Sequence, residues 1–349
     1  MKAKLKFFIA LAVCAGLVYL LNRPLGMVPP IGKFLDPFNG AWQNALQSDI
    51  PGSKELIITG LNAGVQVVYN DRGVPHIFAR NERDLCFAAG YIMASHRLWQ
   101  MEFIALAATG RLSEVLGDRT LEFDRYTRRM GMTYGAEKMV EDIRKDPQML
   151  EQMNAYTEGI NAWIDGLSPR QYPFEYKLLD YSPEPWNLVK STSVIMYMNR
   201  DLTFANSSLR MSALKAMWGE EAVVAFLDTP PKFNETVVSR RDWDFPLMPP
   251  APPVSDFLPQ FILDSLVADR DPGIGSNNWA VSGALTESGY PMLATDPHLS
   301  ATLPAIWFEM QLQAPGINVY GVTVPGGEPF RSEERRVGEE CCSRGSRDL

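Results

Sequence analysis

The sequence predicts an α+β protein in which a mainly helical half precedes a half made of short strands. Apolar and aromatic residues recur at helical spacing through much of the stretch from residue 82 to about 227. From residue 277 onward, short runs rich in β-branched and aromatic residues alternate with turn signals, which is typical of strands. The proline cluster PLMPPAPP at 246–253 separates the two patterns, because it cannot continue a helix or a sheet interior.

The composition indicates a globular protein without a nucleic-acid partner. The chain has 349 residues, of which 46% are hydrophobic, so it is long enough to bury a large core. Its formal net charge is −8, and the body of the sequence carries no dense tract of lysine or arginine. The phosphates of a nucleic acid need a basic footprint, and the sequence does not supply one.

Residues 1–24 predict export across a membrane. Lys2, Lys4 and Lys6 precede an apolar run over residues 7–21, which is typical of a signal peptide or a membrane anchor. The run is shorter than the roughly 20 residues of a full membrane span, and no small-residue cleavage site follows it cleanly, so both interpretations stay open. We therefore expect a protein that faces the periplasm, either released or anchored to the membrane.

The body is expected to begin with short strands followed by a long helix. The runs LIITG at 56–60 and GVQVVY at 64–69 are rich in β-branched residues, and residues 70–73 form a turn signal. From residue 82 to about 116 apolar residues recur at helical spacing, with Gly110 as the expected break.

Further helices and four strands complete the expected elements. Tyr156, Ile160 and Trp163 mark one helical face, and residues 191–227 predict one or two more helices. The expected strands are NNWAVSG at 277–283, PMLAT at 291–295, AIWFEMQLQ at 305–313 and INVYGV at 317–322. A turn signal at 286–289 separates the first two strands and predicts a hairpin.

Ser276, in the stretch GIGSNNWAVSG, suits a nucleophile as well as a plain loop that enters a strand. A serine nucleophile needs a base, and in a catalytic triad this is a histidine. The chain has three histidines, His76, His96 and His298, but Ser276 lies outside any G-x-S-x-G elbow. The other solution is the serine's own α-amino group, with a pKa of about 7.7 to 8.0 once the Gly275–Ser276 bond has been cut.

Several separated motifs resemble, in the same order, those of the penicillin acylase (penicillin amidase) family of N-terminal-nucleophile hydrolases. In the first half these are DRGVPHIFARNERDLCFAAGYIMASHRLWQM, GRLSEVLG, YTEGINAWIDG and the Pro-Trp of YSPEPWNL. In the second half they are GSNNWAVSG, LATDPHLS and GVTVPGGEPF. The resemblance covers residues 54–330 and implies an αββα sandwich built from a largely helical α chain and a β-rich chain.

The resemblance implies that Ser276 is the nucleophile and that its α-amine is the base after autocatalytic cleavage of the Gly275–Ser276 bond. The substrate would be a small-molecule linear amide, and the chemistry would require no cofactor. The resemblance also implies that His298 borders the nucleophile. A hairpin that turns about Glu287 supports this, since residues 276 and 298 both lie eleven positions from it and would pair side by side.

The family's substrate pocket draws on a helix of the α chain, and MYMNRDLTF resembles that helix. The implied pocket residues are Tyr197, Met198, Asn199, Arg200 and, on the β side, Leu299. The plain interpretation of this stretch is core packing for the methionine and a solvated guanidinium for the arginine.

Other residues of the shared motifs carry no assigned chemistry. The resemblance implies a structural calcium ion, but where the family has a glutamate this sequence reads NSSLR, with Ser207 or Ser208 at that position. We therefore assign no metal ligands. His76 and His96 lie in motifs without nucleophilic chemistry, and we interpret them as structural.

Part of the family pattern would lie beyond Phe330. The GHN motif, the oxyanion-hole residues and most of the β-chain sheet would follow it, so we expect the chain as written to be inactive. Residues 331–349, RSEERRVGEECCSRGSRDL, change abruptly to a charged pattern without apolar periodicity and read like translated adapter sequence. We interpret them as a non-native tail.

The predicted organisation is a leader or anchor at 1–24, an α-chain region at 25–244, a spacer at 245–275, the start of the β chain at 276–330, and the tail at 331–349. The predicted function is that of an exported, self-cleaving amidohydrolase precursor, whose α and β chains stay together. β-Lactam acylase and N-acyl-homoserine lactone acylase activities are both open. The alternatives are a membrane-anchored binding protein without catalysis and an inactive fragment.

Overall fold

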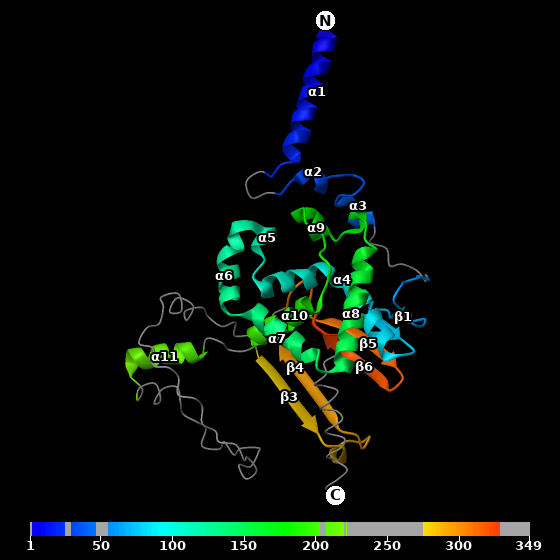
Figure 1. Cartoon of the computed structure of the whole chain (residues 1–349), viewed down its shortest axis with the longest axis vertical. Helices are drawn as coiled ribbons and strands as arrows, with labels where there is room; N and C mark the ends of the chain where they lie inside the picture. Colours follow the sequence, from blue (N-terminus) through cyan, green and yellow to red (C-terminus); the bar gives the residue numbers. More distant parts are fainter. Residues whose placement is uncertain are drawn as a thin grey trace. The chain divides into compact units, whose positions relative to one another are not determined.

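A computed structural model describes residues 2–24, 29–46, 55–202, 207–219, 221, 275–299 and 301–328, and it confirms the α+β class (Figure 1). The described residues fall into two compact units. The first unit takes them from 1–199, 280–292 and 301–349, and the second from 200–279 and 293–300. Most of the predicted spacer, residues 245–274, and the predicted tail lie outside the described residues.

Three helices precede the body of the first unit. They are α1 (Lys2–Leu21), α2 (Ile31–Phe34) and α3 (Trp42–Leu46). Within α1, the window Lys4–Leu21 has a mean hydropathy of 2.0, and none of it is buried. Its length and composition fit a membrane-crossing helix, and a signal sequence near the N-terminus has the same properties.

A four-stranded sheet joins parts of the chain that are more than two hundred residues apart. Its order is β1 (Gln66–Tyr69), β2 (Pro75–Phe78), β5 (Phe308–Ala314) and β6 (Ile317–Thr323). The outer pairs, β1–β2 and β5–β6, are antiparallel, whereas the central strands β2 and β5 run parallel, with His76 opposite Gln311. The turn predicted at 70–73 is confirmed, because it closes the β1–β2 hairpin.

The strand predicted over LIITG is wrong. Residues 55–58 have no regular structure, and residues 59–60 form a turn in which Gly60 has a φ of +112°. Ile57 is fully exposed, whereas Ile58 packs against the core. A β-branched run needs a partner strand to form a ladder, and none of the described strands pairs with this one.

The long helix α4 (Glu82–Thr109) is the centre of the first unit. The side chain of Asn81 accepts a hydrogen bond from the backbone N–H of Asp84, which caps the first turn. The helix ends where predicted, because Gly110 takes the left-handed conformation (φ +64°) and turns the chain away. The following residues are held by the buried carboxylate of Asp124, which accepts from the backbone N–H groups of Leu112 (3.0 Å) and Ser113 (2.7 Å).

The core lies where α4 crosses α8 (Pro147–Asp165) and the sheet. Tyr156 and Ile160 of α8 are fully buried, which confirms the predicted helical face. The helices can approach this closely because residue 159 is a glycine. A Cβ at that position would overlap the carbonyl oxygen of Phe87. Alternate residues of β5 face the same core, and they are Phe308, Met310, Leu312 and Ala314.

The remaining helices are labelled in Figure 1, and α11 and the last residues of α10 belong to the second unit. They are α5 (Ser113–Leu116), α6 (Leu121–Arg129), α7 (Met132–Ile143), α9 (Phe174–Leu179), α10 (Leu188–Leu202) and α11 (Ser207–Trp218). Short 3-10 helices span Gly117–Thr120 and Pro169–Gln171. One or two helices were predicted over residues 191–227, and α10 and α11 confirm this for the described residues of that stretch.

Candidate active site

A hairpin carries the predicted nucleophile. Strand β3 (Gly275–Val281) pairs with β4 (Met292–His298) in a two-stranded sheet, which confirms the predicted hairpin (Figure 1). Ser276 is the second residue of β3, and its side chain is exposed. The connection contains a 3-10 turn (Gly283–Leu285), and a Cβ at Gly283 would overlap the carbonyl oxygen of Gly289. Only glycine therefore fits this tight connection.

His298 ends strand β4 within the second unit, beside the start of β3. Its Nε2 atom lies 3.3 Å from Nδ2 of Asn277, the residue after Ser276. Counting residues from the turn at Glu287 predicted that His298 would pair side by side with Ser276. In the structure its imidazole lies against Asn277, the residue after that serine. The catalytic roles of Ser276 and His298, and the cleavage at Gly275, stay predictions.

The five predicted pocket residues are divided between the two units. Tyr197 packs against the buried cluster of Leu106, Ala107 and Leu112 in the first unit. On the same helix, Met198 is half-buried and Asn199 is exposed. Arg200 and Leu299 belong to the second unit and are half-buried. Their role in substrate binding stays a prediction.

The N-terminal half of α10 is fixed by side-chain hydrogen bonds. Oγ1 of Thr192 donates to the carbonyl oxygen of Ala136 on α7 at 3.0 Å. The indole Nε1 of Trp186 donates to Oγ of Ser191 at 2.9 Å, and both side chains are buried. The half of α10 that carries Tyr197 and Met198 continues from this hydrogen-bonded half.

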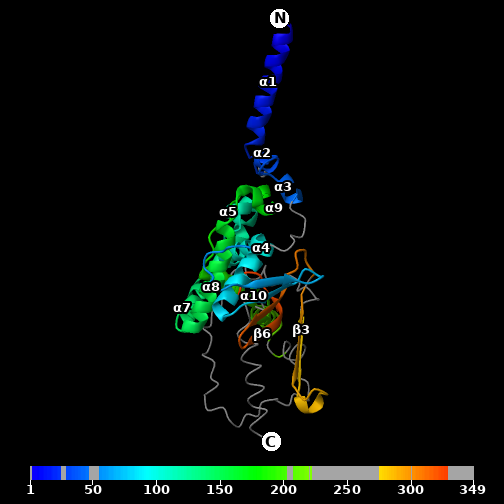
Figure 2. The same cartoon turned by 90° about the vertical axis from the view of Figure 1, so that its right-hand side faces the viewer.

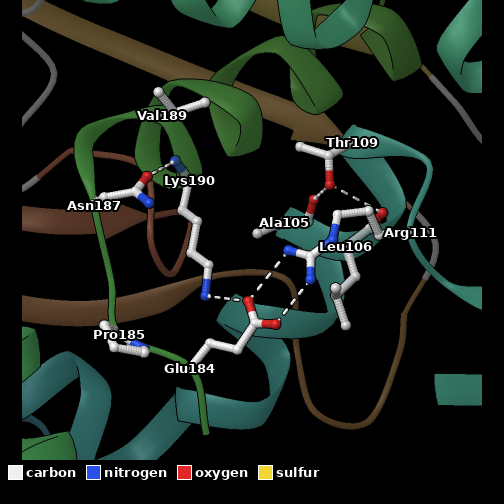
Figure 3. Close-up of a pocket in the computed structure, with 9 residues that line it drawn as sticks. All are labelled: Ala105, Leu106, Thr109, Arg111, Glu184, Pro185, Asn187, Val189 and Lys190. Atoms are coloured by element: carbon white, nitrogen blue, oxygen red, sulfur yellow. Dashed lines mark hydrogen bonds and ion pairs between the residues drawn. The ribbon is translucent and has the colours of Figure 1, made fainter. Parts of the chain in front are cut away.

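A pocket of about 260 Å³, which sequence reasoning missed, lies in the first unit between α4 and the start of α10 (Figure 3). Its lining residues are Ala105, Leu106, Thr109, Arg111, Glu184, Pro185, Asn187, Val189 and Lys190. Figure 3 shows the carboxylate of Glu184 between the ammonium group of Lys190 and the guanidinium of Arg111. The ion pairs measure 3.0 Å to the lysine and 2.8 Å to the arginine.

A buried carboxylate continues this charge network behind the pocket. Glu102 on α4 is almost fully buried and accepts hydrogen bonds from Nζ of Lys190 (3.1 Å) and the backbone N–H of Glu184 (3.2 Å). The hydroxyl of Tyr176 donates to its other oxygen. Because each cation at the pocket is paired with a carboxylate, the network fixes α4, α9 and α10 together rather than offering a free charge to a ligand.

The network shifts the pKa values of its members. Hydrogen bonding to the guanidinium of Arg111 lowers the pKa of Glu184 to about 2, with Lys190 adding to the effect. Burial and the neighbouring Glu102 raise the pKa of the Tyr176 hydroxyl far above its usual range. At neutral pH, Glu184 is therefore an anion and Tyr176 a neutral donor.

The other two histidines make contacts that fit a structural role. Nε2 of His96 lies 3.0 Å from the hydroxyl of Tyr69, and its ring packs against Phe308. Burial lowers the pKa of His96. Nδ1 of His76 is hydrogen-bonded to Oε1 of Gln311 on the neighbouring strand. Both histidines lie in the first unit: His76 links β2 to β5 within the sheet, and His96 links α4 to β1 and β5.

Among the described residues, no three side chains of His, Cys, Asp or Glu gather in a group that could hold a metal ion. Ser207 and Ser208, at the position where the resemblance leads us to expect a calcium-binding glutamate, begin α11.

The chain is similar to a group of acylases. A family model described as penicillin amidase matches residues 64–328. Penicillin acylase 2 proenzyme from Pseudomonas sp. (strain SE83) is 32% identical over 300 residues, which cover 82% of this chain and 37% of that protein. Acyl-homoserine lactone acylase QuiP from Pseudomonas fluorescens (strain Pf0-1) is 28% identical over 297 residues, which cover 81% and 34%.

Among solved structures, the thermostable penicillin G acylase from Alcaligenes faecalis matches with 26% identity and a TM-score of 0.40. The match covers 54% of this chain and 98% of that chain. The chain spans roughly a third of the length of the curated relatives named above.

Proposed function

The chain belongs to the penicillin amidase family, and on this premise we propose that its protein is an amidohydrolase with Ser276 as nucleophile. It would cleave carbon–nitrogen bonds of linear amides other than peptides. The observation that carries this proposal is the place of Ser276, exposed at the start of β3, directly after Gly275 and within the matched region.

Maturation begins with self-cleavage before Ser276. Its hydroxyl oxygen attacks the carbonyl carbon of Gly275, the peptide C–N bond breaks, and the former amide nitrogen leaves as the α-amine of Ser276. Water then hydrolyses the resulting ester, which frees the carboxylate of Gly275 and restores the hydroxyl. Only after this step does Ser276 have a free α-amine that can act as a base.

Amide hydrolysis uses both groups of the new terminus. An α-amine with a pKa of about 7.7 to 8.0 is partly unprotonated at neutral pH, so it can take the hydroxyl proton as Oγ attacks the substrate carbonyl. The same proton then goes to the leaving amine, and an acyl-enzyme ester remains. Water attacks that ester and releases the acid. Nucleophile and base belong to one residue, so this chemistry needs no cofactor.

The two fragments of a cleaved precursor would stay associated. Strand β5 follows the cleavage point, yet it pairs in parallel with β2, which precedes it. Gly326 also lies after the cleavage point, and a Cβ there would be 3.1 Å from the ring of Trp186 and 3.2 Å from Met101. These contacts support an α chain and a β chain that close one core, as in the αββα sandwich expected from the family.

The proposed location is the periplasm. The apolar helix α1 and the lysines at its start support export, with α1 either removed as a signal sequence or kept as an anchor.

The proposed substrates carry an acyl group on an amide nitrogen. One similar protein is named a penicillin acylase and another an acyl-homoserine lactone acylase, and these names support both substrate classes as candidates. The ratio of kcat/KM for a phenylacetylated β-lactam to that for an N-acyl-homoserine lactone decides between them.

Alanine substitution of Ser276 tests the proposal in the protein expressed from its complete gene. Ser276→Ala has no hydroxyl, so we expect an uncut precursor that hydrolyses neither substrate. Ser288→Ala is the matched control, since Ser288 is an exposed serine in the connection of the same hairpin. Normal processing and activity of Ser276→Ala would overturn the proposal.

A further inference from the structure

The segment between α1 and the body is fixed to α9 and its surroundings by hydrogen bonds. We call residues 31–46 the linking segment. Nζ of Lys177 on α9 donates to the carbonyl oxygen of Gly40 (3.2 Å), to Oδ1 of Asn44 (2.7 Å) and to the carbonyl oxygen of Arg170 (2.8 Å). Nδ2 of Asn44 donates in turn to the carbonyl oxygen of Tyr172 at 2.9 Å. A buried lysine that binds three oxygens holds the linking segment in one position.

Further contacts complete this attachment. Lys33 forms a 2.7 Å ion pair with Asp180, and the ring of Phe34 packs edge-on against Phe174, with centroids 5.3 Å apart. Within the linking segment, a Cβ at Gly40 would overlap the carbonyl oxygen of Phe34, so the segment closes tightly on itself. Figure 2 shows α2 and α3 beside α9.

This fixed surface exposes large apolar side chains, although a polar face would cost less in water. The exposed fractions are 76% for Phe38, 62% for Trp42 and 70% for Leu46. The other exposed members are Leu35 of the linking segment and Phe174 and Leu178 of α9. We call these six residues the apolar patch.

The position of the patch indicates a lipid partner. Helix α1 ends at Leu21, and the side chain of Asn22 lies against the start of α2, where a Cβ at Gly32 would be 2.7 Å from its Oδ1. The linking segment that carries the patch therefore begins beside the end of an exposed helix that is apolar enough to cross a membrane. Tryptophan and tyrosine are enriched at the headgroup level of membranes, where one side of the ring contacts acyl chains and the other contacts polar headgroups.

We propose that the apolar patch lies in the headgroup region of the phospholipid bilayer that α1 enters, and that it holds the α9 face of the first unit against the lipid surface. The inference rests on the proposal that α1 reaches a membrane. Interfacial elements of this kind bury their apolar side chains about 5–10 Å into the boundary between headgroups and acyl chains. The linking segment would then fix the orientation of the body relative to the membrane instead of acting as a free tether.

Fluorescence quenching by lipids tests this contact in the full chain. The protein is reconstituted in vesicles of phosphatidylethanolamine and phosphatidylglycerol that contain a lipid with a shallow nitroxide. A bimane label is placed at one of three positions: Phe38→Cys in the patch, Tyr134→Cys on α7 as a control of similar exposure, or the native Cys14 in α1. The other reactive cysteines, Cys341 and Cys342 and, for the first two labels, Cys14, are replaced by serine.

The fourth cysteine does not interfere with the labelling. Cys86 is fully buried in α4, and burial raises the pKa of its thiol far above the usual range. A second patch label, Trp42→Cys, guards against a local effect at position 38.

We expect nitroxide lipids to quench the labels at positions 38 and 42 at least about twofold more strongly than the label at position 134, with aqueous iodide giving the reverse order. Equal quenching at the patch and at position 134 would overturn the inference. Protection of the patch labels from both quenchers would overturn it as well, because protein rather than lipid would then cover the patch. The label on Cys14 reports on α1 separately. Quenching at Cys14 without quenching at position 38 would overturn the inference about the apolar patch, but it would still support the proposal that α1 reaches a membrane.

Discussion

The ammonium group of Lys190 on α10 lies 3.1 Å from a carboxylate oxygen of Glu102 on α4, and both side chains are buried. Removing one partner of a buried ion pair leaves the other charge without compensation, which costs about 3–5 kcal/mol. We therefore expect Lys190→Met to lower the free energy of unfolding by an amount in that range, measured by urea denaturation. Adding Glu102→Leu should recover part of the loss.

The control for this pair is an exposed one. Lys138 and Glu141 form a 2.8 Å ion pair on the surface of α7, with each side chain about half exposed. Surface pairs contribute roughly 0–1 kcal/mol, so Lys138→Met should change the free energy of unfolding by no more than that. Equal losses for both lysine variants would contradict the view that the buried network fixes α10.

A second prediction concerns the crossing of α4 and α8. The Cβ of Gly159→Ala would overlap the carbonyl oxygen of Phe87, so the helices must separate. Overpacking of this kind costs about 1–3 kcal/mol or more, and we expect a loss of stability of that size in thermal unfolding. Gly64→Ala is the control, because no atom lies within 4 Å of its Cβ position; a loss as large as that of Gly159→Ala would argue against the steric explanation.

A third prediction is a pH dependence that comes from Glu184. Its pKa is about 2 in the folded protein against 4.5 in the unfolded chain, because Arg111 and Lys190 favour the charged form. The stabilisation is fully present above pH 4.5 and is lost as the pH falls from there towards 2. We expect Glu184→Gln to be less stable at neutral pH and to lose less stability over this window, measured by urea denaturation at several pH values.

The control uses the other carboxylate on the same guanidinium. Glu114 pairs with Arg111 at 2.7 Å but is about half exposed, so Glu114→Gln should keep most of the slope in the acidic window. An unchanged slope in Glu184→Gln would show that other groups cause the acid sensitivity.

Local signals predicted most of the elements. Gly110 ended its helix as expected, because a left-handed turn after an amphipathic run is encoded by neighbouring residues. The strand predicted for LIITG was wrong. A strand depends on a partner that can lie far away in the sequence, and β-branched residues alone do not reveal whether such a partner is available. The same limit hid the parallel pairing of β2 with β5, which joins residues 76 and 311.

The site was harder to predict than the elements. Ser276 emerged from its chemistry and from the family resemblance, whereas the pocket beside Glu184 was missed because isolated charged residues resemble a solvated surface. Glu102 did carry a signal. It lies four positions after Leu98 and three before Ala105, both buried on the same helical face, so a carboxylate there had to find partners in the core.

A fourth prediction separates the two roles of Ser276. In Ser276→Cys a thiol can still attack the carbonyl carbon of Gly275, so we expect cleavage to continue. Amide hydrolysis should fall strongly, because the sulfur atom and the pKa of the thiol match the site less well than a hydroxyl group. The measurements are gel analysis of processing and kcat on an N-acylated amide. A Ser276→Cys protein that is no longer cleaved, or that keeps full amide hydrolysis, would contradict this separation of the two roles.

The central claim is that Ser276 becomes the first residue of a chain, and the N-terminal sequence of the mature fragments tests it most directly. The protein is expressed without substitutions from its complete gene, its two fragments are separated, and each is subjected to Edman degradation. The account predicts one fragment that begins at Ser276 and continues through Asn277 and Asn278. An active protein that remains a single chain, or a β-chain fragment that begins at any residue other than Ser276, would contradict it.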